Sequence, residues 1–217
     1  PCFGYELAVI LQDGVRRMLE EQEDLFYYVT VMNENYAHPP MPQGCEPGVL
    51  RGMYLLRQGA LRQAREERGS GTAARRVQLL GSGAILRECL VAAETLEREH
   101  GLPADVWSVT SWSELRWDAM LDDGGSCAVR EARFNEGERN GTPWITQCLA
   151  ATEGPIIAAS DYVSAVADLI RPWIPPGRRY VALGTDGFGR SDTRAALREF
   201  FAVNAAAIVR AALGGQT

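Results

Sequence analysis

Hydrophobic residues recur at helical spacing near the start of the chain. Within residues 5–21 they alternate with charged residues such as Arg16, Arg17 and Glu20, which predicts an amphipathic helix. The run FYYVTVM at residues 26–32 is rich in aromatic and β-branched residues and predicts a largely buried strand. A helix that leads into one such strand is the end of an α/β domain rather than a complete domain. The apolar positions of the helix are Leu7, Ile10, Leu11, Val15, Met18 and Leu19.

A proline-rich segment interrupts both patterns. Residues 37–44 contain three prolines, and each removes a backbone donor and favours extended backbone. We therefore expect residues 1–36 to end one domain, residues 37–48 to form a linker, and residues 49–217 to form a second domain. Within that second domain, residues 69–72 (GSGT) predict a flexible surface loop.

Strand and helix patterns alternate from residue 77 onward. Such alternation predicts an α/β sheet with helices on its faces. The expected strands are 77–80, 105–109, 144–149, 156–159 and 179–183, and the expected helices are 84–99, 161–173, 192–201 and 204–213.

The amino-acid composition argues against several classes of function. The 46% hydrophobic content is enough for a sizeable core, and no run approaches the roughly 18 apolar residues of a membrane span. The start PCFG lacks the basic region of a signal peptide, so we expect a cytoplasmic protein. Because the first residue is not Met, we also expect a piece of something longer. A net charge of −6 argues against a nucleic-acid partner.

Several kinds of reactive site are disfavoured by residue type. All 22 basic residues are arginines, which excludes a Schiff-base or Walker lysine. The two histidines, His38 and His100, are far apart in sequence and offer little for a histidine-based triad or metal cluster. The cysteines are odd in number, widely spaced and without a CxxC pair, so we expect reduced thiols rather than disulfides or a zinc site. They are Cys2, Cys45, Cys89, Cys127 and Cys148.

Two turns follow predicted strands and invite a ligand-binding interpretation. The GSG run at residues 81–83 could begin a dinucleotide fingerprint, but the third glycine is replaced by Leu86, whose bulk would oppose close helix–strand packing. We expect a tight turn there. Ser111 and Glu114 have capping-box spacing. Together with Trp112 they also lie at the carboxyl end of a strand, where α/β proteins usually bind ligands, so both a cap and a cleft role stay open.

Residues 183–194 (LGTDGFGRSDTR) are the most distinctive stretch of the chain. Three glycines within six positions make a sharply turning loop, and either Ser191 or Asp192 is the expected N-cap of the next helix. We expect Asp186 and Arg190 to lie close together and to brace this loop by hydrogen bonds.

Seven further motifs along the chain belong with the 183–194 stretch. They are YELAVI (5–10), DG (13–14), NENY (33–36), VQLLGSG (77–83), SVTS (108–111), EL (114–115) and ASDY (159–162). In this order, the motifs resemble the homodimeric, bacterial-type pyruvate dehydrogenase decarboxylases of the transketolase-like thiamine diphosphate family. The resemblance spans nearly the whole chain and weakens at residues 59–75 and 121–141.

This resemblance implies a fold and a context. It implies a transketolase C-terminal-domain-like mixed sheet with helices on both faces, preceded by the last helix and strand of a pyrimidine-binding domain. Asn33, Glu34, Asn35 and Tyr36 would then end that strand, facing a cleft or anchoring the linker, and His38 would face the dimer cleft or the surface. The implied partners are the rest of the same polypeptide, a second copy in a homodimer and the lipoyl transacetylase.

The resemblance also implies thiamine diphosphate and magnesium in the full-length enzyme. The chain lacks the GDG-to-NN segment that this cofactor requires, so we assign no catalytic, cofactor or metal residue and expect the chain to be inactive alone. Two alternatives stay open. The enzyme could act on another 2-oxo acid such as 2-oxobutyrate, or the chain could be a non-catalytic, separately encoded half of a transketolase-like enzyme.

Overall fold

A computed structural model describes residues 1–59, 76–122 and 141–215. The helices are α1 (Gly4–Val15), α2 (Glu46–Leu50), α3 (Leu86–His100), α4 (Trp112–Asp122), α5 (Trp144–Leu149), α6 (Ser164–Ala167), α7 (Arg194–Phe200) and α8 (Ala205–Leu213). The strands are β1 (Met53–Arg57), β2 (Val77–Gly81), β3 (Ala104–Val109), β4 (Ile156–Ala159) and β5 (Tyr180–Leu183). A π-helical turn (Arg16–Glu20) extends α1, and 3₁₀ turns lie at Gly83–Ile85 and Asp168–Trp173.

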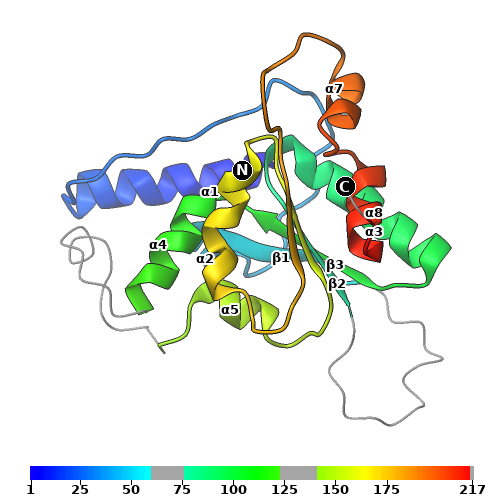
Figure 1. Ribbon diagram of the computed structural model, residues 1–217. Helices are drawn as coiled ribbons and strands as arrows, with labels where there is room; N and C mark the ends of the chain where they lie inside the picture. Colours follow the sequence, from blue (N-terminus) through cyan, green and yellow to red (C-terminus); the bar gives the residue numbers. More distant parts are fainter. Residues whose placement is uncertain (60–75, 123–140, 216–217) are drawn as a thin grey trace.

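The five strands form one mixed sheet in the order β1-β3-β2-β4-β5. Strands β3, β2, β4 and β5 are parallel, whereas β1 pairs antiparallel with β3 at the edge. Helix α3 makes the crossover from β2 to β3, as parallel neighbours require. The predicted α/β class and mixed sheet are therefore confirmed, while α1 and the extended segment after it lie to one side of the sheet (Figure 1).

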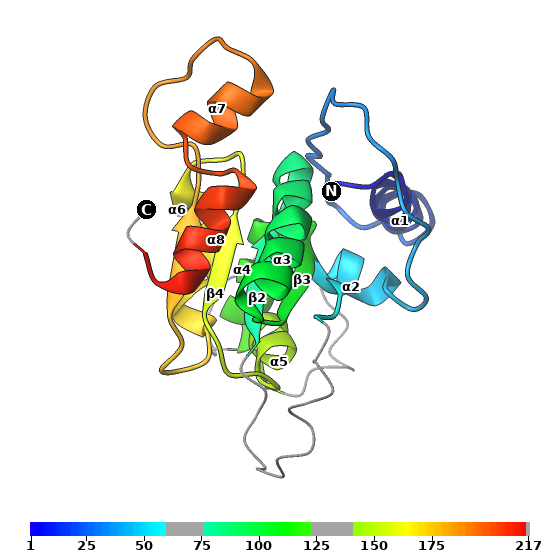
Figure 2. The ribbon, with the colours of Figure 1, turned by 90° about the vertical axis from the view of Figure 1, so that its right-hand side faces the viewer.

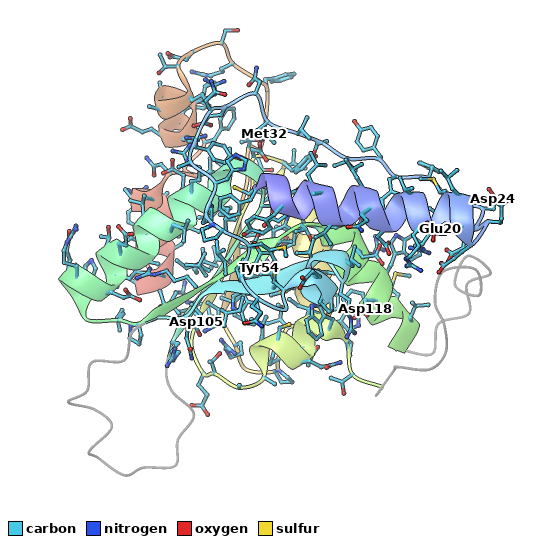
Figure 3. All side chains as sticks on the ribbon, turned by 180° about the vertical axis from the view of Figure 1, so that it is seen from behind. Glu20, Asp24, Met32, Tyr54, Asp105 and Asp118 are labelled. Carbon is cyan, nitrogen blue, oxygen red and sulfur yellow. The ribbon has the colours of Figure 1, made fainter. Side chains whose placement is uncertain are left out.

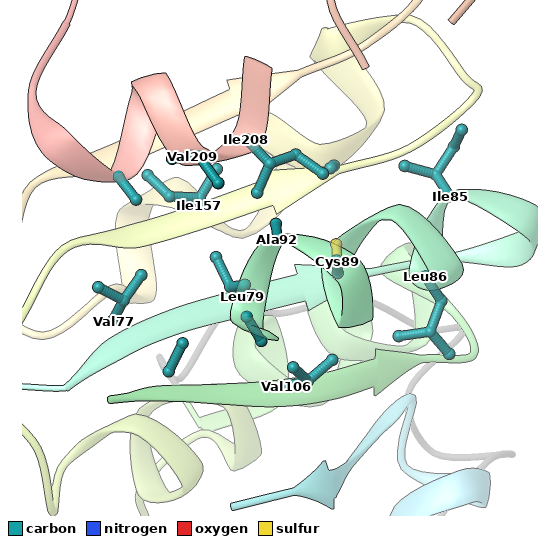
Figure 4. Close-up of a cluster of buried hydrophobic side chains, with 14 of the residues drawn as sticks. Val77, Leu79, Ile85, Leu86, Cys89, Ala92, Val106, Ile157, Ile208 and Val209 are labelled. Carbon is teal, nitrogen blue, oxygen red and sulfur yellow. The ribbon is translucent and has the colours of Figure 1, made fainter. Parts of the chain in front are cut away.

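Each parallel strand sends alternate side chains to the two faces of the sheet. On one face, Leu79 and Ile157 pack under α3 and α8, in the core that Figure 4 shows in close-up. On the other face, Leu80 and Ile156 pack against α4 and α5. Because both faces are covered (Figure 2), the strands are apolar almost throughout, which is why their sequences predicted them well.

A glycine sets the distance between β2 and α3. A Cβ on Gly81 would lie only 2.7 Å from the Cα of Leu86. Leu86 was expected to oppose close packing at this turn, and that expectation is wrong, because the missing side chain of Gly81 makes the room. The tight turn itself is confirmed, with Gly83 at a positive φ of 52°.

Two predicted strands are wrong. Residues 26–32 are extended but form no strand, because no other strand of the described residues lies beside them; Phe26 and Tyr28 are more than four-fifths exposed. Residues 144–149 form helix α5 instead. Its fully buried residues, Ile145 and Leu149, are four apart, which is helical rather than strand spacing.

Several boundaries also differ from the expectation. Strand β1 was not predicted, and α2 begins inside the expected linker. The expected helix 161–173 is the short α6 followed by the 3₁₀ turn. The N-cap of α7 is Thr193, whose hydroxyl accepts from Ala196 N, rather than Ser191 or Asp192. The helix 5–21, the helix 84–99 and the strands 77–80, 105–109, 156–159 and 179–183 are confirmed within about two residues at each end.

The cysteines that the structure describes are free thiols, as expected. Cys2, Cys45 and Cys89 are buried, and Cys148 is half-buried on α5. Cys127 and the predicted loop at residues 69–72 lie outside the described residues.

The Gly81 contact predicts the effect of adding one methyl group. Gly81→Ala should lower the free energy of unfolding by about 1–3 kcal/mol, because the new Cβ meets backbone that cannot move freely. Gly189→Ala is the matched control, since a Cβ there meets nothing within 4 Å and its φ is not positive. Urea denaturation of both variants would measure this, and equal stability would contradict the packing account.

Candidate functional site

The order of the strands in the sheet reverses between β2 and β4. The chain leaves β2 toward β3 on one side and later returns to β4 on the other. Ligands of open α/β sheets bind in the crevice that such a reversal creates. Here the crevice lies between the turn after β2, at Ser82 and Gly83, and the turn after β4, at Ser160 and Asp161.

Two serines and a tryptophan tie these turns together. The Ser82 hydroxyl donates to the Ser160 hydroxyl at 2.9 Å, and the indole N–H of Trp112 donates to Ser82 at 3.1 Å. The backbone N–H of Tyr162 donates to the Ser160 hydroxyl. The side chains of Ser82, Trp112 and Ser160 are all buried, so their hydrogen bonds fix the shape of the site.

Asp161 is the one group of this site that is left incompletely paired. Its Oδ1 is buried and lacks a hydrogen-bond partner among the described residues. Burial raises the pKa of Asp161 above its usual range, although a hydrogen bond from its own backbone N–H and then the charge of Arg198 oppose that shift. Oδ1 lies 3.6 Å from where a Cβ on Gly83 would be, at the start of the 3₁₀ turn that leads into α3.

A pocket of about 430 Å³ opens over these turns. The extended segment 25–32 forms one wall, and the carboxyl ends of β2 and β3 together with α4 form another. Met32, labelled in Figure 3, reaches to within 3.2 Å of the Cβ position of Gly83. The predicted residues Ser111, Trp112 and Glu114 line this pocket. Ser111 also caps α4 by accepting from Glu114 N at 3.1 Å, so the cap role is confirmed alongside the pocket position.

The residues after the extended segment form a separate cluster. Glu34 accepts from Arg87 at 2.8 Å and from Arg198 at 2.5 Å, and Asn33 accepts from Arg194. Burial alone would raise the pKa of Glu34, but the two arginines outweigh it and hold that pKa below its usual range. These contacts attach the segment to α3 and α7, as a linker anchor would.

Three further predicted residues flank this anchor. Tyr36 stacks on His38 at 5.1 Å and donates to the Cys2 carbonyl. His38 Nδ1 accepts from Gly4 N at 2.8 Å. Asn35 is exposed. The group therefore closes the start of the chain onto the linker.

The structure gives the two loop residues different partners. Asp186 accepts from Ser164 N at 2.9 Å, at the start of α6. The guanidinium of Arg190 lies over the ring of Phe200 at 3.8 Å. Each residue thus holds the loop through its own contact. The tip between them, Phe188, is 96% exposed.

Glu6 is a buried charged residue that the sequence reasoning missed. Its side chain is fully buried and accepts four hydrogen bonds, from the backbone N–H groups of Cys2 and Phe3 and from the hydroxyls of Tyr54 and Ser108. Figure 3 shows Tyr54 on β1 next to α1. The position of Glu6, a lone acidic residue among the apolar positions of the helix, could have suggested such a buried anchor. Similarly, Ser82 and Ser160, which each follow a strand, could have suggested the crevice.

No group of three or more His, Cys, Asp or Glu gathers as metal ligands within residues 1–59, 76–122 and 141–215. None of the helices in that part of the chain is long and apolar enough to cross a membrane.

Replacing Glu6 by Gln should destabilise the fold strongly. The amide nitrogen cannot accept, so buried donors lose their acceptor, and we expect a loss of about 2–4 kcal/mol in unfolding free energy. Glu99→Gln is the control, because Glu99 pairs with Arg98 at the exposed surface and should change little. Thermal and urea unfolding would measure both, and a near-normal Glu6→Gln variant would contradict the anchor role.

Replacing Asp161 by Asn should stabilise the fold, in contrast to Glu6→Gln. Because the folded pKa of Asp161 is raised, its ionised form opposes folding at neutral pH. Asp161→Asn should therefore raise stability at pH 7 by about 1 kcal/mol, and the gain should vanish as the pH falls below the unfolded value near 3.9. Urea unfolding across this pH range is the measurement. A destabilised variant at pH 7 would mean that Asp161 is a structural acceptor.

Two family models match the chain. The transketolase-like TK C-terminal domain matches residues 52–204, and the pyruvate dehydrogenase E1 component middle domain matches residues 1–39. The "Pyruvate dehydrogenase E1 component" of Pseudomonas aeruginosa is 48% identical over 213 residues, which is 98% of this chain and 22% of that protein. The protein of the same name from Escherichia coli strain K12 is 42% identical over 215 residues, with 99% and 22% covered.

A solved structure titled "Split gene transketolase, inactive beta4 tetramer" aligns with a TM-score of 0.47 at 17% identity, covering 76% of this chain and 42% of that one. The chain spans about 22% of the length of the curated relatives named above. By the match over residues 52–204, the chain belongs to the family of transketolase-like C-terminal domains.

Proposed function

We propose that the chain is the C-terminal part of a pyruvate dehydrogenase E1 component. In the whole enzyme, pyruvate is decarboxylated with thiamine diphosphate, and the acetyl group passes reductively to lipoyl groups of the transacetylase. These residues serve domain packing and assembly and are inactive alone. The enzyme is a cytoplasmic homodimer.

The order of the two family matches carries this proposal. A middle-domain match over residues 1–39 directly precedes the C-terminal-domain match over residues 52–204, and the E1 relatives align with 98% or more of the chain. The two segments are also joined physically, because Glu6 bonds α1 to β1 and β3.

Exposed apolar residues support the packing role. The outer side of α1, the π-helical turn that extends it and the extended segment 26–32 present large apolar side chains that are half-exposed or more. This is unusual for a surface that stays in water. Such a surface suits contact with the remainder of a middle domain. The residues are Leu11, Val15, Leu19, Phe26, Tyr28 and Val31.

The described residues do not fit magnesium and thiamine diphosphate. They offer no cluster of carboxylates that could hold the ion. The nearest sequence to a diphosphate motif, Thr185–Gly187, uses its Asp186 to cap α6. We therefore derive no catalytic step from this chain and assign the cofactor to other parts of the whole enzyme.

The proposal predicts different behaviour for the part and the whole. Calorimetry should show no thiamine diphosphate binding to the isolated 217 residues with magnesium, whereas the full polypeptide that carries them should bind it. Tight, magnesium-dependent binding by the isolated chain would contradict the assignment.

The same full polypeptide identifies the substrate. Its kcat/KM for pyruvate should exceed that for 2-oxobutyrate by about tenfold or more, since one extra methylene is worth that much in a fitted pocket. A preference for 2-oxobutyrate would indicate a related 2-oxo acid enzyme. No turnover of either substrate, with lipoyl acceptor present, would favour a non-catalytic half.

A further inference from the structure

The pocket beside β2 and β4 has the size and walls of a small-molecule site. Its volume of about 430 Å³ lies in the range of ligand sites, about 300–1,000 Å³. Flat aromatic residues supply much of its wall, from the extended segment (Tyr27), from α4 (Trp112 and Trp117) and from the turn after β4 (Tyr162). A planar ligand would find rings to stack on from both sides of the crevice.

The charged groups in this wall are mostly occupied. Arg17 lies 2.9 Å from Glu23 through Nε, and Asp13 accepts from Arg16 and from the Tyr27 hydroxyl. Neither residue therefore needs a ligand.

Asp161 differs, because its buried Oδ1 has no donor among the residues that the structure describes. A buried acceptor without a partner costs free energy that a ligand donor would recover.

The position of Asp161 also decides the sign of the ligand charge. The N–H groups that begin a helix ordinarily attract an anion, and the turn at Gly83 presents such groups. However, both carboxylate oxygens of Asp161 lie within 4 Å of the Cβ position of Gly83. An anion there would meet the carboxylate, whereas a cation or a strong donor would be attracted.

We propose that this pocket binds a small organic cation with a flat apolar body, and that Asp161 receives its amidinium or ammonium group. The ring of Trp117 holds the body, and the Ser82–Ser160–Trp112 hydrogen bonds keep the floor rigid. The inference does not rest on the proposed function, because it uses only the described residues around the crevice.

Benzamidine is a suitable probe, with neutral benzamide and anionic benzoate as matched comparisons. Each is titrated into the full polypeptide that carries these residues, without thiamine diphosphate or 2-oxo acid, by calorimetry and by tryptophan fluorescence. We expect saturable benzamidine binding that quenches tryptophan emission, and affinities for benzamide and benzoate that are weaker by about tenfold or more, since only the cation makes a charge-assisted bond. Equal or tighter binding of benzoate would overturn the proposal, as would no binding of benzamidine.

Two variants locate the site. Asp161→Asn should weaken benzamidine binding by about tenfold or more through loss of the ionic partner. Asp168→Asn makes the same charge change nearby, at a residue paired with Arg171, and should leave the affinity unchanged. An unfolding curve of Asp161→Asn separates lost binding from lost folding. Unchanged affinity in a folded Asp161→Asn variant would overturn the proposal. Because the readout is binding and not turnover, it stands apart from any failure of the pyruvate assay.

Discussion

The arrangement of the amino-terminal segment on the sheet depends on one buried carboxylate. Glu6 accepts from the chain start, from Tyr54 on β1 and from Ser108 on β3, and no part of its side chain reaches solvent. Removing an ionised group from water costs several kcal/mol, which is recovered only when the surrounding donors are all in place. The interaction is therefore selective for one orientation of α1. The extended segment after α1, and with it one wall of the pocket, follows from that orientation.

A second ionic cluster fixes the other end of the same segment. Glu34 joins Arg87 on α3 to Arg198 on α7, and Arg198 in turn contacts Glu88, whose other oxygen accepts from Ala205 N at the start of α8. The extended segment therefore lies between two fixed points, Glu6 and Glu34. Residues 37–44 follow the second of these points and are mostly exposed. Glu6 and Glu34 thus each attach residues 1–39, which match one family model, to residues 52–204, which match the other.

The sequence predicted the parts of the fold that local pattern determines. Strands such as 77–80 are continuous apolar runs because both faces are covered, and that pattern is visible without knowing the neighbours. Residues 26–32 have the same kind of pattern, but no strand of the described part of the chain lies beside them. Residues 144–149 have apolar residues at helical spacing and follow Pro143. Strand formation depends on pairing across the chain, which composition alone does not reveal.

The residues of the candidate site also fall into those that a local pattern reveals and those that depend on distant contacts. Ser111 was identifiable because a capping box is a local motif, and Trp112 because it follows a strand end. Glu6 and Asp161 were not, since their significance comes from groups more than 40 residues away or from the absence of such groups. The expected closeness of Asp186 and Arg190 treated a loop as self-contained, whereas each contacts a different helix.

The antiparallel direction of β1 has a topological consequence. Met53, the first residue of β1, pairs with Val109, the last residue of β3, and the Gly52 carbonyl accepts from Thr110 and Ser111 just beyond it. Everything that precedes β1 in the chain is thereby delivered to the carboxyl edge of the sheet. A parallel edge strand would have delivered it to the opposite edge, about one strand length away. A single reversed strand thus determines that an upstream domain would be attached beside the crevice, and shortening or lengthening residues 37–44 would change its distance but not the edge it meets.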